Sequence, residues 1–244
     1  MPLTTLPPNT VPPACAPDAS APIARRQVLV TASVLPLLAL PGCATSVGGF
    51  SLVEAIRRLL TLSSQRAFAT LLQPGGFYDN QAARLPLPPR LAEDRSLVTR
   101  VLTSAPVRDR LGRELNRAAE RGAERAAPII TDAIRTLSIT DALAIARGGG
   151  RAATDLLEGS VGSALIRAMF PAVGDALRVA SDPVLGQVLR SVTGYDVAAL
   201  AGDVTQGANR AIWNAIGAEE IAIRANPQST NDPLLIAALT LAGR

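Results

Sequence analysis

The sequence contains no histidine and no lysine, so all 24 of its basic residues are arginine. Without histidine there is no Ser-His-Asp or Cys-His catalytic relay and no histidine-ligated zinc. Without lysine there is no phosphate-loop lysine and no Schiff-base chemistry. These absences exclude most ordinary hydrolase and kinase mechanisms, and we expect neither a cofactor nor a metal site.

Aromatic residues are also scarce, at 3% of the chain, whereas 48% of the residues are hydrophobic. Leu, Ile, Val and Ala must therefore fill the interior, and such a composition favours closely packed helices. No segment shows the alternating pattern of a strand. The two cysteines, Cys15 and Cys43, both precede the main body, which therefore has no disulfide. Together these features predict an all-α fold with a single compact multi-helix domain.

The net charge is only +4 and is concentrated in one part of the chain. Residues 84–125 contain ten arginines against six acidic residues and so hold the whole excess. A basic balance this small, in a chain without lysine, is weak ground for nucleic-acid binding. We therefore expect no nucleic-acid partner.

The stretch "ARRQVLVTASVLPLLALPGC" (24–43) has the arrangement of an export signal. Its apolar part, residues 28–40, is 13 residues long, whereas a membrane-spanning helix needs roughly 20. Arg25 and Arg26 supply the positive flank of a signal peptide and resemble a twin-arginine motif. The sequence "LPGC" resembles a lipobox, in which cleavage precedes Cys43 and its sulfur becomes lipidated. The alternative is a cysteine that merely lies near the end of a leader.

The chain therefore divides into four segments. Residues 1–22 are rich in proline and predict a disordered extension, or sequence ahead of the true start codon. Residues 23–43 form the signal peptide, 44–50 a linker, and 51–244 the helical domain. We expect an exported, periplasmic protein, anchored in the membrane by lipid, with the outer membrane as its destination.

Helical spacing of apolar residues continues through most of the body. Ser51 and Glu54 match a capping box, and Pro128 suits the first turn of a new helix. Pro171 is expected to kink a helix, and glycines along 202–217 to interrupt another. Helices are predicted over about 51–72, 90–103, 106–125, 128–137, 140–147, 151–157, from 160 onward, 183–192, 196–225 and 231–242.

Four stretches carry a resemblance to a bacterial family. They are "GFYDNQAARLPLP" (76–88), "LNRAAERGAERAAPIITDAIRTLSITDA" (115–142), "GGGRAAT" (148–154) and "VTQGANRAIWNAIGAEEIAIRANP" (204–227). Over about residues 51–240 the chain resembles the domain of unknown function family 4197. The resemblance implies an exported, mostly helical protein without an assigned activity. Relatives often carry acidic residues after the paired glycines, where this chain has arginine, which argues against a cation role for this loop.

An arginine stripe is the most conspicuous local chemistry. Its members recur every four residues, with glutamates interleaved at pairing distance: Arg113, Arg117, Arg121 and Arg125, with Glu114, Glu120 and Glu124. The simpler interpretation is a solvated face with weak ion pairs. The alternative is a surface that docks on anionic lipid headgroups or an envelope polymer.

Other positions point to structural or binding roles. Asn116 in mid-helix predicts a buried hydrogen bond to another helix. Glu220 and Arg224 are spaced for an ion pair, and a further pair from Glu220 to the arginine stripe is conceivable. Arg151, after three glycines, could help to bind an anion, although helix capping explains the glycines more simply. The candidate positions are Asn116, Arg117, Glu120, Arg121, Arg151, Glu220 and Arg224.

Two functional hypotheses follow. The first is an exported, lipid-anchored helical protein that binds or supports a component of the cell envelope; its partners are the membrane and an envelope protein or anionic polymer. The alternative is a hydrolase-type enzyme that uses carboxylates and arginine on a glycan or phosphate ester, with Asp79, Asp155, Glu120 or Glu220 as acid. Converging acids with raised pKa values in a cleft favour the enzyme, whereas a closed apolar core with exposed, paired charges favours the binding module.

Overall fold

The computed structural model describes residues 46–47, 50–88, 104–140, 142–179 and 197–242. The chain forms two compact units, 1–41 and 42–244, and every described residue belongs to the second. The predicted signal peptide, Cys43, and the helices predicted over 90–103 and 183–192 lie outside the described residues.

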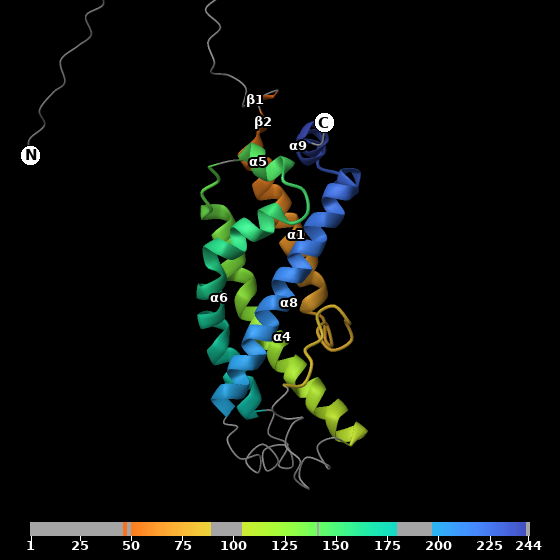
Figure 1. The fold of residues 1–244 in the computed structure, drawn as a ribbon, viewed down its shortest axis with the longest axis vertical. Coiled ribbons are helices and arrows are strands. Elements are labelled where there is room, and N and C mark those ends of the chain that lie inside the picture. Colours follow the sequence, from red (N-terminus) through yellow and green to blue (C-terminus); the bar gives the residue numbers. More distant parts are fainter. Residues whose placement is uncertain (1–45, 48–49, 89–103, 141, 180–196, 243–244) are drawn as a thin grey trace, which may run out of the picture. The chain divides into compact units, whose positions relative to one another are not determined.

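Helices make up most of the described residues, which confirms the all-α fold (Figure 1). A two-residue antiparallel pairing of β1 (Ser46–Val47) with β2 (Phe50–Ser51) precedes them, at the junction of the predicted linker and helical domain. The helices are α1 (Leu52–Leu71), α4 (Ala105–Thr136), α5 (Ala142–Arg147), α6 (Ala152–Val179), α8 (Val197–Ala225) and α9 (Pro233–Ala242), with a 3-10 turn, η1 (Pro227–Thr230), before α9.

The four long helices α1, α4, α6 and α8 pack around one apolar core. Leucine, isoleucine, valine and alanine fill most of this core, as the composition predicts, and each long helix contributes a buried face. Trp213 of α8 is almost completely buried, and its ring nitrogen donates a hydrogen bond to Asn209 at 3.0 Å. The indole therefore fills the interior without leaving its N–H group unpaired.

Two predicted helix boundaries are wrong. Pro128 lies inside α4, so the helices predicted over 106–125 and 128–137 are one helix. The helices predicted over 151–157 and from 160 onward are likewise one helix, α6, and Pro171 lies inside it. An internal proline removes one backbone hydrogen bond and costs about 3 kcal/mol in a helix. The fully buried Ala126 and Ile130 flank Pro128, and the burial of such residues along both helices offsets that cost.

The glycines of α8 do not interrupt it either, because Val197–Ala225 is one continuous helix. The capping box at α1 is also wrong. Ser51 occupies the N-cap position, but its side chain makes no capping hydrogen bond. Glu54 pairs with Arg58 instead, at 3.1 Å, one turn further along α1. Its carboxylate is therefore drawn to a guanidinium group rather than to the backbone.

A glycine allows a close approach of α4 to α6. A Cβ atom on Gly122 would lie 2.9 Å from Cγ2 of Val173 and 3.2 Å from Cε of Met169. Val173 and Met169 are fully buried, so neither side chain can move into solvent. By contrast, a Cβ atom on the exposed Gly159 of α6 would meet no other group within 4 Å.

We predict that Gly122→Leu lowers the free energy of unfolding by about 1–3 kcal/mol, because the added side chain must push α4 and α6 apart. The measurement is urea denaturation of residues 44–244, followed by circular dichroism. Gly159→Ala serves as the control and should raise stability by up to about 1 kcal/mol, because alanine is the better helix former. Equal stability of Gly122→Leu and the unmodified protein would contradict the close packing.

Candidate functional site

A buried carboxylate connects α8 to the start of α6. Glu220 is 0% exposed and accepts hydrogen bonds from the backbone N–H groups of Ala153, at 3.1 Å, and Thr154, at 2.7 Å. The hydroxyl of Thr154 also donates to it, at 2.6 Å. The N–H groups in the first turn of a helix have no partner within that helix. Glu220 therefore caps α6 from a different helix.

Arg224, one turn further along α8, completes the arrangement. Its guanidinium group lies 2.7 Å from Oε1 of Glu220, so the predicted ion pair is present. It also donates to the carbonyls of Ala146, at 2.9 Å, and Ile145, at 3.1 Å, in the last turn of α5. An anion at a helix start and a cation at a helix end both complement the helix dipole. The pair, here called the Glu220–Arg224 clamp, thus holds α5 and α6 on α8.

The turn between α5 and α6 contains two glycines, and the clamp binds the chain on both sides of it. Gly149 and Gly150 adopt φ angles of +50° and +57°, in the left-handed region that glycine tolerates best. Arg151 then donates to Asp155 and Glu158, each at 2.7 Å, and to Asn214 of α8 at 3.2 Å. The bond to Asn214 joins α6 to α8. Because two carboxylates already bind the guanidinium group, Arg151 is not positioned to bind an anion, which supports the capping interpretation of this loop.

Asn116 of α4 is fully buried and holds the segment that follows the glycine-rich loop. Its side-chain oxygen accepts the N–H of Leu85 at 2.9 Å, and its nitrogen donates to the carbonyls of Leu85, at 3.2 Å, and Gly112, at 2.8 Å. We predicted a buried hydrogen bond to another helix. The bond is present, but its partner is extended backbone, because Leu85 lies outside any helix or strand and needs partners for both its polar groups.

A pocket of about 270 Å³ lies between α4 and the loop that follows α1. We call it the Glu120 pocket. It brings together residues from the family-like stretches 76–88 and 115–142 and from the positions beside them. The lining residues are Pro74, Gly75, Tyr78, Asp79, Arg113, Arg117 and Glu120.

Glu120 is the chemically unusual member of this pocket. Its Oε1 atom is buried and makes no hydrogen bond. Burial raises the pKa of Glu120, while the backbone N–H groups of Phe77 and Gly75, followed by Arg117 and Arg121, act in the opposite direction. The carboxyl group therefore retains an unused acceptor in a partly dehydrated position, which is typical of residues at binding or catalytic sites.

Tyr78 fixes the loop against α4 beside this pocket. Its hydroxyl donates a hydrogen bond to Asp109, which raises the pKa of Tyr78 and lowers that of Asp109. The guanidinium carbon of Arg84 lies 3.9 Å from the centre of the ring, and that of Arg113 lies 5.5 Å away. Cations at such distances are attracted to the π face. These contacts set the shape of the pocket wall.

The arginine stripe on α4 is exposed, as the simpler interpretation predicts. Arg113 pairs with Asp109, Arg117 with Glu114 at 2.8 Å, and Arg121 with Glu124 at 3.0 Å. The additional pair that we considered, from Glu220 to Arg117 or Arg121, is not among the ion pairs of the described residues. Glu220 is fully occupied by Arg224 and by the start of α6.

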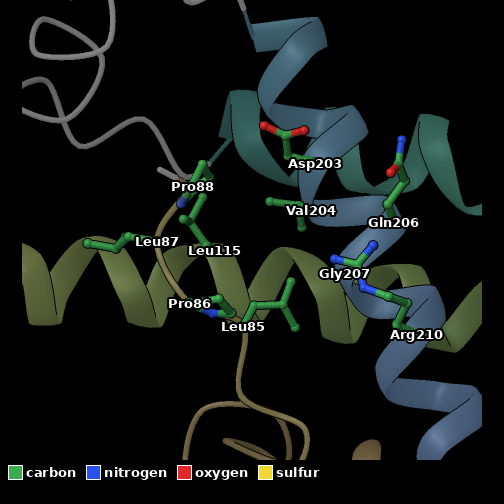
Figure 2. Close-up of a pocket in the computed structure, with 10 residues that line it drawn as sticks. All are labelled: Leu85, Pro86, Leu87, Pro88, Leu115, Asp203, Val204, Gln206, Gly207 and Arg210. Carbon is green, nitrogen blue, oxygen red and sulfur yellow. The ribbon is translucent and has the colours of Figure 1, made fainter. Parts of the chain in front are cut away.

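A second, larger pocket of about 430 Å³ lies where the segment 85–88 crosses α4 and α8. Figure 2 shows Leu85 and Leu87 on this segment, Leu115 on α4, and Asp203, Val204 and Arg210 on α8. A Cβ atom on Gly207 would lie 2.9 Å from Cδ2 of Leu85, so the segment packs directly on α8. Sequence analysis missed this pocket because extended chain outside helices has no periodic pattern.

The structure separates the candidate residues into two groups. Arg117 and Glu120 meet in the Glu120 pocket, and Arg121 is the next residue of α4. Arg151, Glu220 and Arg224 surround the glycine turn between α5 and α6. Asn116 lies on α4, the helix that contributes residues to both pockets. Sequence analysis missed Tyr78 and Thr154 as functional positions, although both lie in family-like stretches. Within the described ranges, no three His, Cys, Asp or Glu residues lie close enough together to hold a metal ion.

Comparison with known proteins identifies a family. The family model described as "Protein of unknown function (DUF4197)" matches residues 46–239. The match covers most of the chain, which therefore belongs to this family and confirms the resemblance inferred from the four stretches. No curated protein and no solved structure matches the chain.

We predict that Glu220→Gln lowers the free energy of unfolding by about 3–5 kcal/mol, because it leaves the guanidinium group of Arg224, which is 11% exposed, without its counter-charge. Urea denaturation of residues 44–244 measures the change. Glu124→Gln, which removes an exposed ion pair on α4, is the control and should change stability by less than about 1 kcal/mol. Similar effects of the two substitutions would show that the clamp is not essential to the fold.

Proposed function

We propose that this member of the DUF4197 family is an exported, lipid-anchored helical protein that acts at the cell envelope by binding, without catalysing a reaction. The export signal in residues 23–43 and the lipobox-like sequence before Cys43 support the location. In this proposal the mature chain begins at Cys43, its lipid holds it on the periplasmic side of the outer membrane, and the helical body carries the binding site.

The Glu120 pocket carries the binding part of the proposal. Asp79 and Glu120 offer hydrogen-bond acceptors, and Arg113 and Arg117 offer donors, around one small cavity. The buried Oε1 atom of Glu120 has no partner of its own. A small number of polar groups that converge on a concave site is typical of sites that bind a small molecule or a segment of a polymer. A saccharide fits this set, because its hydroxyl groups both donate and accept.

The arrangement of the other charges supports binding over catalysis. The core is apolar, and many charged side chains form local ion pairs at the surface, such as Arg135 with Asp132 and Arg178 with Asp175. The same pairing weakens the idea that the arginine stripe docks on an anionic surface, since carboxylates accompany three of its four members.

A hydrolase-type enzyme is the second candidate, and one observation favours it. Asp79 and Glu120 line the same pocket, and the pKa of Glu120 is raised. Two carboxyl groups, one held protonated as acid and one ionised, are the machinery of glycoside hydrolysis. The same saccharide ligand would then be a substrate, so a test must separate binding from cleavage.

We expect the native protein to be found in the membrane fraction, with its amino terminus at an acylated Cys43. Cys43→Ser should release it from membranes, because the lipid attachment atom is lost, and replacing both Arg25 and Arg26 by lysine should keep it in the cytoplasm. Fractionation and intact-mass measurement test both. Recovery of unmodified, full-length protein from the cytoplasm would overturn the proposed location.

We expect oligosaccharide fragments released from the cell's own envelope glycans to bind the unmodified protein. Glu120→Gln should weaken this binding about tenfold or more, because an amide cannot replace both carboxylate acceptors. Glu124→Gln, on the same helix but outside the pocket, should bind as the unmodified protein does. Isothermal titration calorimetry measures the affinities.

Chromatography of the same mixtures separates the two candidate functions. Intact oligosaccharide after prolonged incubation is expected of a binding module, whereas shortened products that Glu120→Gln fails to generate would establish the hydrolase. Equal affinity of Glu120→Gln and Glu124→Gln would remove the pocket from both proposals.

A further inference from the structure

The end of the helical body where the chain enters it also carries the most apolar helix. β2 leads directly into α1, and the first turns of α1 contact α5 and α9. Arg58 of α1 holds α9 through Asp232, at 3.1 Å, and Asp232 in turn accepts the N–H groups of Leu234 and Leu235. Figure 1 shows β1, β2, α5 and α9 together at this end.

α9 has the composition of a helix that contacts lipid. Its ten residues, "PLLIAALTLA", include no charged side chain, and only Leu234 and Leu235 are fully buried. Ten residues are far too few to cross a bilayer, which takes roughly 20. An apolar helix of this length that leaves much of its surface uncovered suits a position at the boundary between lipid and water.

Large apolar side chains are exposed on the elements at this end. Leu241 of α9 and Leu143 of α5 are each 48% exposed. Ile221 is exposed in the last part of α8, which η1 connects to α9. These are three of the six large hydrophobic residues that are exposed among the described residues. Leu143 and Leu241 lie on helices that contact each other, and exposed apolar side chains on neighbouring elements mark a contact surface.

The short chain between Cys43 and β1 indicates that this surface contacts the membrane. Ser46 at the start of β1 is the third residue after the proposed lipid attachment at Cys43, so only three residue steps join them. An extended chain covers at most about 3.6 Å per residue, so β1 cannot lie more than about 11 Å from the attachment site. An acylated Cys43 therefore keeps β1, and the elements beside it, close to the bilayer.

Arg147 adds a charge suited to the same partner. It is the last residue of α5, it is exposed, and it takes part in no ion pair of the described residues. The acidic groups on the neighbouring elements, Glu54 and Asp232, are both bound to Arg58. An arginine beside exposed apolar side chains is the combination that binds an anionic lipid surface.

We infer that α9 and Leu143 rest on the membrane to which the lipid on Cys43 attaches the chain, with Leu241 among the lipid headgroups and upper acyl chains. This inference rests on the proposed anchoring at Cys43. It adds a second membrane contact to the lipid anchor, fixes the orientation of the body, and directs the Glu120 pocket, which lies beyond the far end of α1, away from the bilayer.

A fluorescent label at position 241 tests the inference in the lipidated protein. Leu241→Cys is purified from membranes, labelled with an environment-sensitive dye, and placed in vesicles of phosphatidylethanolamine and phosphatidylglycerol. We expect a blue-shifted emission and severalfold weaker quenching by iodide than for a label at Ser163→Cys. Ser163 is exposed on the middle of α6 and serves as the matched control.

The possible outcomes separate this inference from the proposed anchor. The unmodified protein takes up no dye if Cys43 is acylated, because Cys15 is removed with the leader; labelling at Cys43 would overturn the anchor and the membrane contact together. Equal quenching at positions 241 and 163, with Cys43 acylated, would overturn the membrane contact alone. Protection of position 241 in residues 44–244 without vesicles would assign the surface to another copy of the chain instead of lipid.

Discussion

The Glu220–Arg224 clamp is the interaction on which the rest of the structure depends. A buried ion pair by itself is weak ground for stability, since the desolvation of both charges opposes their attraction. Here the two side chains also satisfy backbone groups that helix ends leave without partners, at the end of α5 and at the start of α6. One turn of α8 therefore positions two other helices, and α6, held in this way, forms the partner on which α4 packs.

The use of arginine as the sole basic residue shapes the electrostatics of the protein. A guanidinium group keeps its charge at every physiological pH and can bind several acceptors at once. Arg224 uses this capacity on a carboxylate and two carbonyls, and Arg151 uses it on two carboxylates and an amide. Burial raises the pKa of Glu120, which lines the pocket that we propose as the binding site.

Sequence patterns predicted the helices better than their ends. The periodic apolar residues of α1 placed that helix within one residue at each terminus, because periodicity reports a buried face. The boundary predicted at Pro128 is wrong, because the local propensity of proline is overridden there by the packing of α4. The Glu220–Arg224 pair could be predicted from spacing on one helix. Spacing could not predict the partners of Asn116 or the contact of Tyr78 with Asp109, 31 positions away. Both depend on how the non-helical chain folds back onto α4.

The glycine at the crossing of α4 and α6 has a consequence for how this sequence can evolve. Position 122 has no space for a side chain while valine and methionine occupy positions 173 and 169. A larger residue at 122 becomes acceptable only after one of the other two has become smaller. Drift at these three positions is therefore expected to be correlated across lineages, with volume gained on one helix matched by volume lost on the other.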